Sequence, residues 1–505
     1  MIPEIVLGPP GTGKTTTLLN IVEEELRGGT RPYEIGFVTF TKRGANEAVG
    51  RAVDKFGVDR SDFRFFRTIH SLCFQGLALN NGDILEGKKM LEFGDWIGES
   101  ISEVRYLDEG STFGFTPADR ALFMENLARV KCIPLRKQYD SNYDELPWDL
   151  VDKISRGLAQ FKKDRGLIDY TDMLQRYLDT GRPPRLKILI VDECQDLSQL
   201  QWRVVLFLAQ FAERVVIAGD DDQAIYKWAG ADVDYFIRMV GNSRVLGQSY
   251  RVPRRVQNIS SEIIAGIRNR RAKEWRSRLD KDGKEVDGVV SRIQSIWDAD
   301  LEGREILILG RNAFVLQPML THLRREGIVF NWRGHNSVPS GILQAIMAWE
   351  HIRAGGEILS DEARQMYEYL SSGRGVKRGY KTLPGFSPDQ PVNMQTLRER
   401  GGLNLDGIWH EAMDRIPEAD KLYILRARRR GEQLKKTPRV NVSTIHGAKG
   451  GQGEHVIILT DMADRTYREY LENPEDEHRV WFVGVTRTLE RLTIVAPRSN
   501  KCYEL

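Results

Sequence analysis

Residues 8–15 read Gly-Pro-Pro-Gly-Thr-Gly-Lys-Thr and fit the pattern G-x-x-x-x-G-K-[ST] of a phosphate-binding loop. A short apolar run, Glu4–Leu7, precedes this stretch, and a helical pattern, Lys14–Arg27, follows it. Strand, loop and helix are the context that the motif requires, which argues against a chance glycine-rich turn. Because loop N–H groups and a helix N-terminus together bind phosphate oxygens, the stretch predicts a nucleoside triphosphate site in an α/β fold.

The loop also predicts individual contacts with the nucleotide. Lys14 would neutralise phosphate charge, and the Thr15 hydroxyl would ligate Mg²⁺. The loop residues expected to contact the nucleotide are Gly8, Pro9, Pro10, Gly11, Thr12, Gly13, Lys14, Thr15 and Thr16. The motif leaves open what the hydrolysis is used for.

A second apolar run supplies the carboxylates that such a site needs. Residues 188–196 read ILIVDECQD, so Asp192 lies where the expected strand ends. Asp192 would hold Mg²⁺ through water, and Glu193 would orient or deprotonate the attacking water. The alternative, an acidic helix cap after a strand, accounts for one carboxylate but poorly for the group. The long separation of Lys14 from Asp192 exceeds one compact crossover and indicates an insertion.

Further apolar, β-branched runs indicate parallel sheets, because such runs are buried on both faces. They are Ile35–Phe40, Ile188–Val191, Val215–Ala218, Glu305–Leu309, Val440–Ser443 and Val456–Leu459. Helical patterns cover Lys42–Phe56, Asp119–Arg129 and Gly341–Ala354. The expected fold class is α/β, with two parallel-sheet domains that each carry a mainly helical insertion. The expected limits are 1–75 with 165–250 for the first domain, 76–164 for its insertion, 251–335 with 438–505 for the second domain, and 336–437 for its insertion.

Composition restricts the class of protein without identifying it. Hydrophobic residues make up 41% and charged residues 29% of the 505 residues, which is ordinary globular usage and excludes global disorder. The formal net charge of +3 neither requires nor forbids a nucleic acid partner. The four cysteines are scattered, which argues against a disulfide framework or a zinc site. With no membrane-length apolar stretch and no secretory signal at the start, we expect a soluble, intracellular, cytoplasmic protein.

Seven further motifs resemble, in order along the chain, those of the UvrD/Rep/PcrA-like superfamily-1A DNA helicases. The matching stretches are VTFTK at 38–42, TIHS at 68–71, IDYTDML at 168–174, AGDDDQAIYKW at 218–228, QSYR at 248–251, STIHGAKG at 443–450 and VGVTR at 483–487. The resemblance spans nearly the whole chain, and so many motifs in the right order exclude coincidence. The chain resembles a short, phage- or plasmid-type member of the family, and its pathway, whether DNA repair, replication, recombination or phage DNA metabolism, is left open.

The resemblance implies two RecA-like P-loop motor domains that hydrolyse ATP, with Mg²⁺, in the cleft between them. Gln223 would sense the γ-phosphate, and Arg251 and Arg487 would act as arginine fingers from the second domain, since the guanidinium fork suits phosphate. Tyr250 is the expected stacking platform for the base. Gly450 and Gln452 are the expected cofactor contacts of the second domain, and Gln452 replaces the family's acidic residue. Thr16 stands where close members have Arg, and the family's adenine-reading Gln segment has no counterpart before Gly8, so ATP selectivity is left open.

The resemblance also implies a track for single-stranded DNA, built from aromatic platforms and phosphate donors. The expected DNA-binding residues are Phe40, Thr41, His70, Tyr226, Trp228, Thr444 and His446. Tryptophan at such a spacing is more often a core residue, and the flanking motif favours the platform. Basic runs at 251–278, 372–381 and 426–439 are either solvated helix faces or a phosphate-binding surface. Residues 460–477 occupy the place of the family's strand-separating hairpin, with Tyr467 or Tyr470 as a wedge.

The function expected from these motifs is an ATP-dependent DNA helicase that moves 3′→5′ on single-stranded DNA. Its partners would be single-stranded DNA and junctions of single- and double-stranded DNA, with no membrane and with a monomer as the minimal form. One alternative is a translocase that strips proteins from DNA and unwinds poorly. Another is a P-loop switch or clamp-loading ATPase with no DNA motor, against which the aromatic motif at 226–228 speaks. RNA is left open as a substrate, because stacking and phosphate contacts tolerate both sugars.

Overall fold

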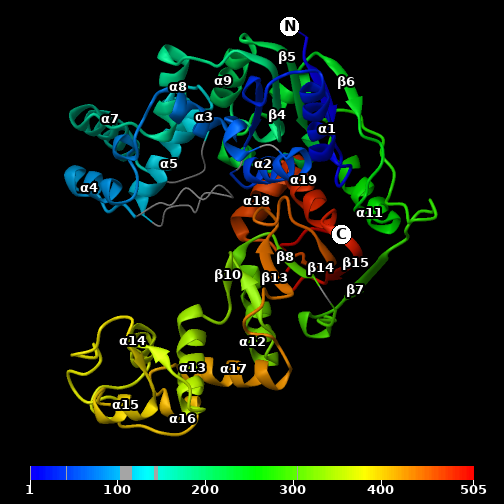
Figure 1. Ribbon diagram of the computed structural model, residues 1–505. Helices are drawn as coiled ribbons and strands as arrows, with labels where there is room; N and C mark the ends of the chain where they lie inside the picture. The colour runs from blue at the N-terminus through cyan, green and yellow to red at the C-terminus, as the bar shows by residue number, and fades with distance from the viewer. Residues whose placement is uncertain (1, 41, 58, 103–115, 142–145, 304) are drawn as a thin grey trace.

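The computed structural model describes residues 2–40, 42–57, 59–102, 116–141, 146–303 and 305–505. Two sheets covered by helices form the main body, with the first at the N-terminal end and the second beneath it (Figure 1). The segment from α13 (Ser340–Arg353) to α17 (Glu418–Arg429) lies in a lobe that projects from the second sheet (Figure 1). None of the described helices combines the length and the apolar character needed to span a bilayer.

The first sheet contains β1 and has the strand order β3-β2-β4-β5-β1-β6, with all neighbouring strands parallel. Its strands are β1 (Glu4–Leu7), β2 (Ile35–Thr39), β3 (Phe65–Thr68), β4 (Leu186–Asp192), β5 (Ala212–Gly219) and β6 (Asn242–Val245). Along β4, Ile188 and Ile190 pack into one hydrophobic cluster, and Leu189 and Val191 pack into another. This period of two explains the continuous apolar run, because both faces of the strand are buried.

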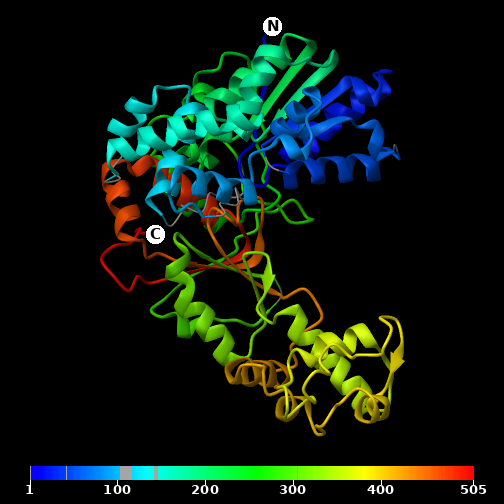
Figure 2. The same ribbon diagram turned by 90° about the vertical axis from the view of Figure 1, so that its left-hand side faces the viewer.

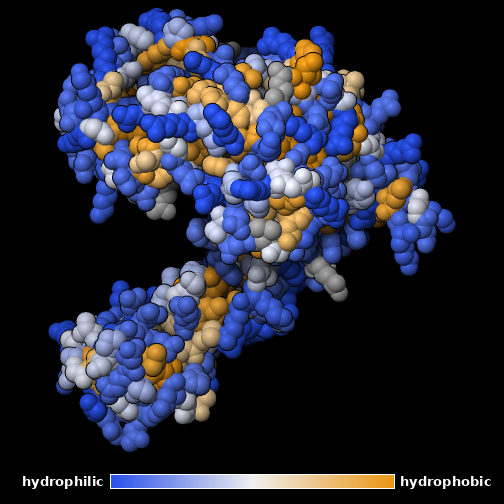
Figure 3. Space-filling view, turned by 45° about the horizontal axis from the view of Figure 1, so that its top comes forward, coloured by the Kyte–Doolittle hydropathy of each residue, from blue (hydrophilic) through white to orange (hydrophobic). Residues whose placement is uncertain are grey.

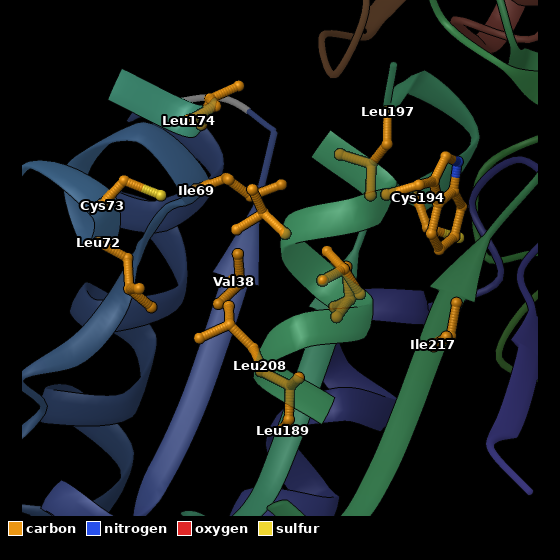
Figure 4. Close-up of a cluster of buried hydrophobic side chains, with 14 of the residues drawn as sticks. Val38, Ile69, Leu72, Cys73, Leu174, Leu189, Cys194, Leu197, Leu208 and Ile217 are labelled. Atoms are coloured by element: carbon orange, nitrogen blue, oxygen red, sulfur yellow. The ribbon is translucent and has the colours of Figure 1, made fainter. Parts of the chain in front are cut away.

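Helices cover both faces of the first sheet. One face packs against α1 (Lys14–Arg27) and α2 (Lys42–Phe56). The other face packs against α3 (Ile69–Gly76), α8 (Tyr170–Thr180), α9 (Gln199–Ala209) and α10 (Val233–Arg238). Figure 4 shows this second cluster, in which Leu72 and Cys73 of α3 and Leu208 of α9 approach Val38 and Leu189 of the sheet.

The second sheet has the order β10-β9-β13-β8-β14-β15-β7, and among its described strands only β10 and β9 pair antiparallel. Its strands are β7 (Val289–Ile293), β8 (Ile306–Gly310), β9 (Phe330–Trp332), β10 (His335–Asn336), β13 (Val440–Thr444), β14 (Gly453–Leu459) and β15 (Thr488–Val495). On one face lie α11 (Arg254–Ala265), α18 (Asp464–Glu472) and α19 (Pro474–Val485), and on the other lies α12 (Gln317–Glu326).

Two helical segments with their own cores interrupt the sheets. The first contains α4 (Lys88–Ile97), α5 (Pro117–Val130), α6 (Leu135–Asp140) and α7 (Trp148–Arg165). The second contains α13 (Ser340–Arg353), β11 (Ile358–Leu359), α14 (Ser360–Tyr367), β12 (Pro391–Val392), α15 (Met394–Glu399), α16 (Trp409–Ala412) and α17 (Glu418–Arg429). Figure 2 shows the second segment extending away from both sheets, and Figure 3 shows an open notch between this lobe and the main body.

The structure confirms the α/β class and corrects one local expectation. Helices α1 and α2 have the bounds that their sequence patterns predict. Residues 460–477, predicted to form a pin-like hairpin, instead contain α18 and the start of α19. Pro474 begins α19 and acidic residues follow it, which suits a helix N-terminus. Tyr470 packs against Tyr503, with ring centroids 5.5 Å apart, so it is no free wedge. The domain limits themselves stay a prediction.

Replacing a buried residue of the central strand should destabilise the first sheet. Leu189 is 0% exposed, so we expect Leu189→Ala to lower the free energy of unfolding by about 2–5 kcal/mol. Urea titration followed by circular dichroism measures this, taking the first transition if there are several. Leu471→Ala is the matched control, because Leu471 is 64% exposed and should change stability by no more than about 0.5 kcal/mol. Equal losses in both variants would contradict this account of the core.

Candidate active site

The phosphate-binding loop lies between β1 and α1 and is fixed by backbone contacts. Gly11 and Gly13 have φ angles of +71° and +74°, a region that favours glycine. The Gly8 N–H donates to Gly219 O at 3.0 Å, and the Thr12 hydroxyl donates to Pro9 O at 2.8 Å. The loop is therefore anchored both to β5 and within itself.

The segment that carries Tyr250 and Arg251 closes over the same loop. The Tyr250 N–H donates to Gly11 O at 2.8 Å, and the Ser249 hydroxyl donates to Pro10 O at 2.8 Å. A Cβ on Gly11 would lie 2.4 Å from Arg251 Cβ, so only glycine permits this approach. Although Arg251 was expected to come from the second domain, its backbone therefore lies against the first sheet's loop.

Lys14 lies between the two carboxylates at the end of β4. Its Nζ is 2.8 Å from Glu193 Oε1 and 3.6 Å from Asp192 Oδ1. Burial by itself lowers the pKa of Lys14, but the charges of Glu193 and Asp192 outweigh it and raise the pKa. Burial raises the pKa of Asp192, whereas Lys14 and Lys449 overcome burial and lower the pKa of Glu193. Glu193 is thus held ionised, as a group that accepts a proton from water must be.

Hydrogen bonds connect Glu193 to the second sheet through a row of polar side chains. Gln195 Nε2 donates to Glu193 Oε2 at 2.5 Å, and Gln195 Oε1 accepts from the Asp220 N–H at 3.0 Å. Gln223 Nε2 donates to Asp220 Oδ2 at 2.7 Å. Gln223 Oε1 in turn accepts from Arg487 Nη2 at 2.8 Å. Gln223 and Arg487, both predicted to act on the γ-phosphate, therefore contact each other directly.

Arg251 and Arg487 converge near Glu193. Arg251 Nε donates to Gln452 Oε1 at 2.9 Å, and Gln452 lies two residues beyond Gly450 in the second domain. Burial lowers the pKa of Arg251, and burial together with the charge of Arg251 lowers the pKa of Arg487. An anionic group beside these guanidiniums would stabilise both charges. The arrangement is suited to a phosphate.

Lys449 bridges the two sheets beside this row. Its Nζ contacts Asp196 Oδ2 at 2.5 Å and donates to Gln223 O at 2.8 Å. The same ammonium lies 5.0 Å from the centre of the Tyr226 ring. Lys449 belongs to the motif at 443–450, but the sequence alone does not predict its role, because its partners are more than 200 residues away in the chain.

The same region contains side chains suited to contact the base of the nucleotide and the Mg²⁺ ion. Tyr250 is 70% exposed, and its ring lies close to Gly13 at the start of α1, as a base platform would. Thr15 is the second residue of α1 and precedes the exposed Thr16. The Thr15 hydroxyl and the Asp192 carboxylate are the hard oxygen ligands that Mg²⁺ takes, usually with phosphate and water. Among the described residues no group of three or more His, Cys, Asp or Glu could hold a metal alone.

A cleft of about 2420 Å³ lies between the first insertion and the second sheet. Trp228, Thr444 and His446 line it, and so do Arg251, Gly450 and Gln452. Trp228 stacks on Phe123 of α5 with ring centroids 6.3 Å apart, and it lies edge-on to His446 at 6.2 Å. Three of the expected DNA-binding residues therefore share one cavity with residues from the nucleotide site.

The remaining expected DNA-binding residues are placed differently. Tyr226 is 4% exposed and packs between Phe40, at 5.6 Å, and His446, at 6.1 Å. Tyr226, Phe40 and His70 are not among the described residues that line the cleft, and His70 lies edge-on to Tyr170. Thr41 lies outside the described residues. The position of Tyr226 fits a contact between the two domains better than a platform for bases.

The first basic run is mostly engaged within the protein. Arg270 forms two hydrogen bonds with the Asp222 carboxylate, and Arg271 donates to the backbone oxygens of Phe236 and Met239. Lys273 is buried against Asp220, Asp221 and Asp222. The expectation of a phosphate-binding surface is therefore wrong for these three residues. For Arg270 and Lys273 the cause is the acidic triplet Asp220, Asp221 and Asp222, whereas the Arg271 guanidinium is bound by backbone oxygens; local charge counting predicts neither arrangement.

The fold and the site define a P-loop nucleotide-binding protein with two parallel sheets that share one site. The UvrD/REP helicase N-terminal domain model matches residues 2–242, and the UvrD-like helicase C-terminal domain model matches residues 414–499. The chain belongs to the UvrD-like helicase family.

Several bacterial proteins are similar to this chain. DNA helicase II of Escherichia coli (strain K12) is 23% identical over 605 aligned residues, which cover 99% of this chain and 83% of that protein. YjcD of Bacillus subtilis (strain 168) is 24% identical over 55% of this chain. PcrA of Staphylococcus aureus (strain Mu50) is 24% identical over 54% of it. The chain spans 38% and 39%, respectively, of the lengths of these last two proteins.

Removing the Glu193 carboxylate should abolish hydrolysis and spare binding. We expect Glu193→Gln to bind ATP but to lose activity by about two orders of magnitude or more, because the amide cannot accept the water's proton. Phosphate release and binding of a fluorescent ATP analogue measure the two steps. Glu213→Gln is the matched control on the exposed surface of β5. Near-normal turnover by Glu193→Gln would overturn its assignment.

Truncating Tyr250 tests the base platform. Loss of a stacking ring costs about 1–3 kcal/mol, so we expect Tyr250→Ala to raise KM for ATP roughly tenfold. Tyr250→Phe keeps the ring and should stay within about twofold of the unaltered protein. Comparing ATP with GTP and CTP in the same assay reports base selectivity. An unchanged KM in Tyr250→Ala would exclude stacking on this ring.

Proposed function

We propose that this protein is an ATP-dependent motor on single-stranded DNA, which moves 3′→5′ and unwinds duplexes. The observation that carries the proposal is the row of hydrogen bonds from Lys14 through Glu193 and Gln223 to Arg487. Such a row gives the γ-phosphate, once bound, direct contact with groups from both sheets. Hydrolysis and release of phosphate would then alter the contact between the sheets.

The positions of the residues in this row and beside it indicate their roles in hydrolysis. Lys14 would neutralise phosphate charge, Glu193 would accept a proton from the attacking water, and Asp192 with Thr15 would hold Mg²⁺. Arg251 and Arg487 would stabilise the charge that develops on the transferred phosphoryl group. A bound Mg²⁺ would neutralise phosphate oxygens during the transfer.

The segment 224–231 supports coupling between the nucleotide and the cleft. It follows Gln223 directly, and Ile225, Tyr226 and Ala231 are buried in the core of the second sheet. Trp228 of the same segment lines the cleft. A shift of Gln223 would therefore be transmitted over a few residues to a ring that can stack on a base.

The DNA substrate and the polarity rest on the family. DNA helicase II and PcrA are named as DNA helicases, and the motifs that carry the resemblance include those around Trp228, Thr444 and His446. We place single-stranded DNA in the cleft lined by these residues. The single strand of DNA would pass across the second sheet, and the duplex would lie ahead of the protein.

Stimulation by DNA is the decisive test. We expect ATP hydrolysis to rise at least about tenfold with single-stranded DNA, because closure of the two sheets around DNA completes the site. Unwinding of 3′-tailed but not 5′-tailed duplexes then tests polarity. Absence of stimulation would favour a P-loop switch and exclude a DNA motor. Stimulation with streptavidin displacement but no unwinding would favour a protein-stripping translocase.

Truncating the cleft tryptophan tests where DNA binds. We expect Trp228→Ala to raise the DNA concentration for half-maximal stimulation about tenfold, since one base-stacking contact is worth about 1–3 kcal/mol. Trp297→Ala is the matched control, because Trp297 is exposed on the second domain away from this cleft. An unchanged DNA requirement in Trp228→Ala would remove the cleft assignment.

A further inference from the structure

A buried ammonium lies beside the nucleotide site among three carboxylates. The Lys273 side chain is 1% exposed, and its Nζ lies 2.9 Å from Asp220 Oδ1 and 3.0 Å from Asp222 Oδ2. It also contacts Asp221 Oδ1. Asp222 has a second cation in Arg270, which binds it through two hydrogen bonds. Asp220, by contrast, has Lys273 as its cationic partner.

The ionised Asp220 determines how the Gln223 amide is oriented. A carboxylate can only accept hydrogen bonds and a guanidinium can only donate them. Between Asp220 and Arg487, the Gln223 amide can therefore satisfy both only with its nitrogen toward Asp220 and its oxygen toward Arg487. These are the observed contacts, at 2.7 Å and 2.8 Å.

Without its ammonium partner, Asp220 would lose this role. Burial raises the pKa of Asp220 and the charge of Lys273 opposes that shift, while Asp222 and Asp221 add to it. A protonated Asp220 could donate to the Gln223 oxygen. The amide would then be free to turn over, which would present N–H groups to Arg487 and leave that guanidinium without its acceptor.

The segment that bears Lys273 also contacts the segment that bears Arg251. The Arg276 N–H donates to Gly247 O at 2.8 Å, and the Ser249 N–H donates to Arg276 O at 2.9 Å. Ser249 is in turn bonded to the phosphate-binding loop at Pro10 O. The backbone around Lys273 is thus held independently of its ammonium, so removing the charge leaves a frame in which its effect can be measured.

We propose that Lys273 is a positioning residue for nucleotide hydrolysis, which keeps Asp220 in the state that orients the Gln223 amide toward Arg487. Its ammonium is buried and acts through two other side chains, Asp220 and Gln223. The proposal rests on the proposed hydrolysis of ATP at this site and adds a residue from outside the motifs that define it.

The test is a double-mutant cycle with Gln223. We expect Lys273→Met to keep KM for ATP within about threefold while kcat falls about 10²-fold, as it should in Gln223→Ala. Because both act through one amide, the double variant should be no worse than the more impaired single variant, within about threefold. A merely structural Lys273 would give losses that multiply. Lys281→Met, on an exposed turn of the same chain region, is the control and should change neither constant.

A second variant covers the case in which Lys273→Met does not fold, as judged by thermal unfolding. Asp220→Asn removes a buried charge and keeps the shape, and its amide can donate to Gln223. We expect normal ATP binding with kcat lowered at least about tenfold. Folded Lys273→Met or Asp220→Asn with kcat near normal overturns the proposal, and so does a multiplicative double variant. If the unaltered protein itself shows no ATP hydrolysis with or without DNA, the proposed function fails instead.

Discussion

The ion pair between Lys14 and Glu193 constrains everything around it. Opposite charges shielded from water stabilise a protein only when their other hydrogen-bonding groups are also paired; Lys14 is 11% and Glu193 33% exposed, and Gln195 pairs the second oxygen of Glu193. Gln195 in turn fixes the Asp220 backbone, Asp220 fixes Gln223, and Gln223 binds Arg487. Each polar group is oriented by the one before it. A change in charge at the phosphate-binding loop would therefore have consequences in the second sheet.

The contact between the sheets combines this polar row with ordinary hydrophobic packing. The segment after Gln223 connects the first sheet to the core of the second. Its residues Ile225, Tyr226 and Ala231 pack in the cluster that also contains Trp481 and Val483 of α19. Arg479 of α19 donates to Asp221 O at 3.0 Å, so the same helix reaches back to the acidic triplet. Burial of apolar surface holds the segment, and the hydrogen bonds set its direction. Such a joint can transmit a small displacement because neither side can yield alone.

Local patterns predicted most of what is local. The phosphate-binding loop, α1, α2 and the strand ends that carry Asp192 follow from periodicity and motif context, because their structure depends on neighbours in sequence. Local patterns do not predict the contacts of Tyr226 or of the basic run at Arg270, because the partners lie elsewhere in the chain: His446 and Phe40 for the ring, and the acidic triplet for Arg270 and Lys273. The wrong hairpin at 460–477 has the opposite origin, because local signals were available there. Resemblance gave the position of that segment, whereas its own Pro474 and acidic first turn favour a helix.

The buried charges around Asp220 are expensive, and that cost is informative. Three carboxylates and Lys273 are buried, and Arg270 is partly buried, where apolar residues of similar volume would often be as stable or more so. A packed apolar cluster, however, could not distinguish the two ends of the Gln223 amide. A group that only accepts hydrogen bonds, as an ionised carboxylate does, makes this distinction although the amide's oxygen and nitrogen have nearly the same shape. The cluster therefore makes one of the two nearly isosteric orientations of the Gln223 amide favourable. In that orientation the amide oxygen binds Arg487.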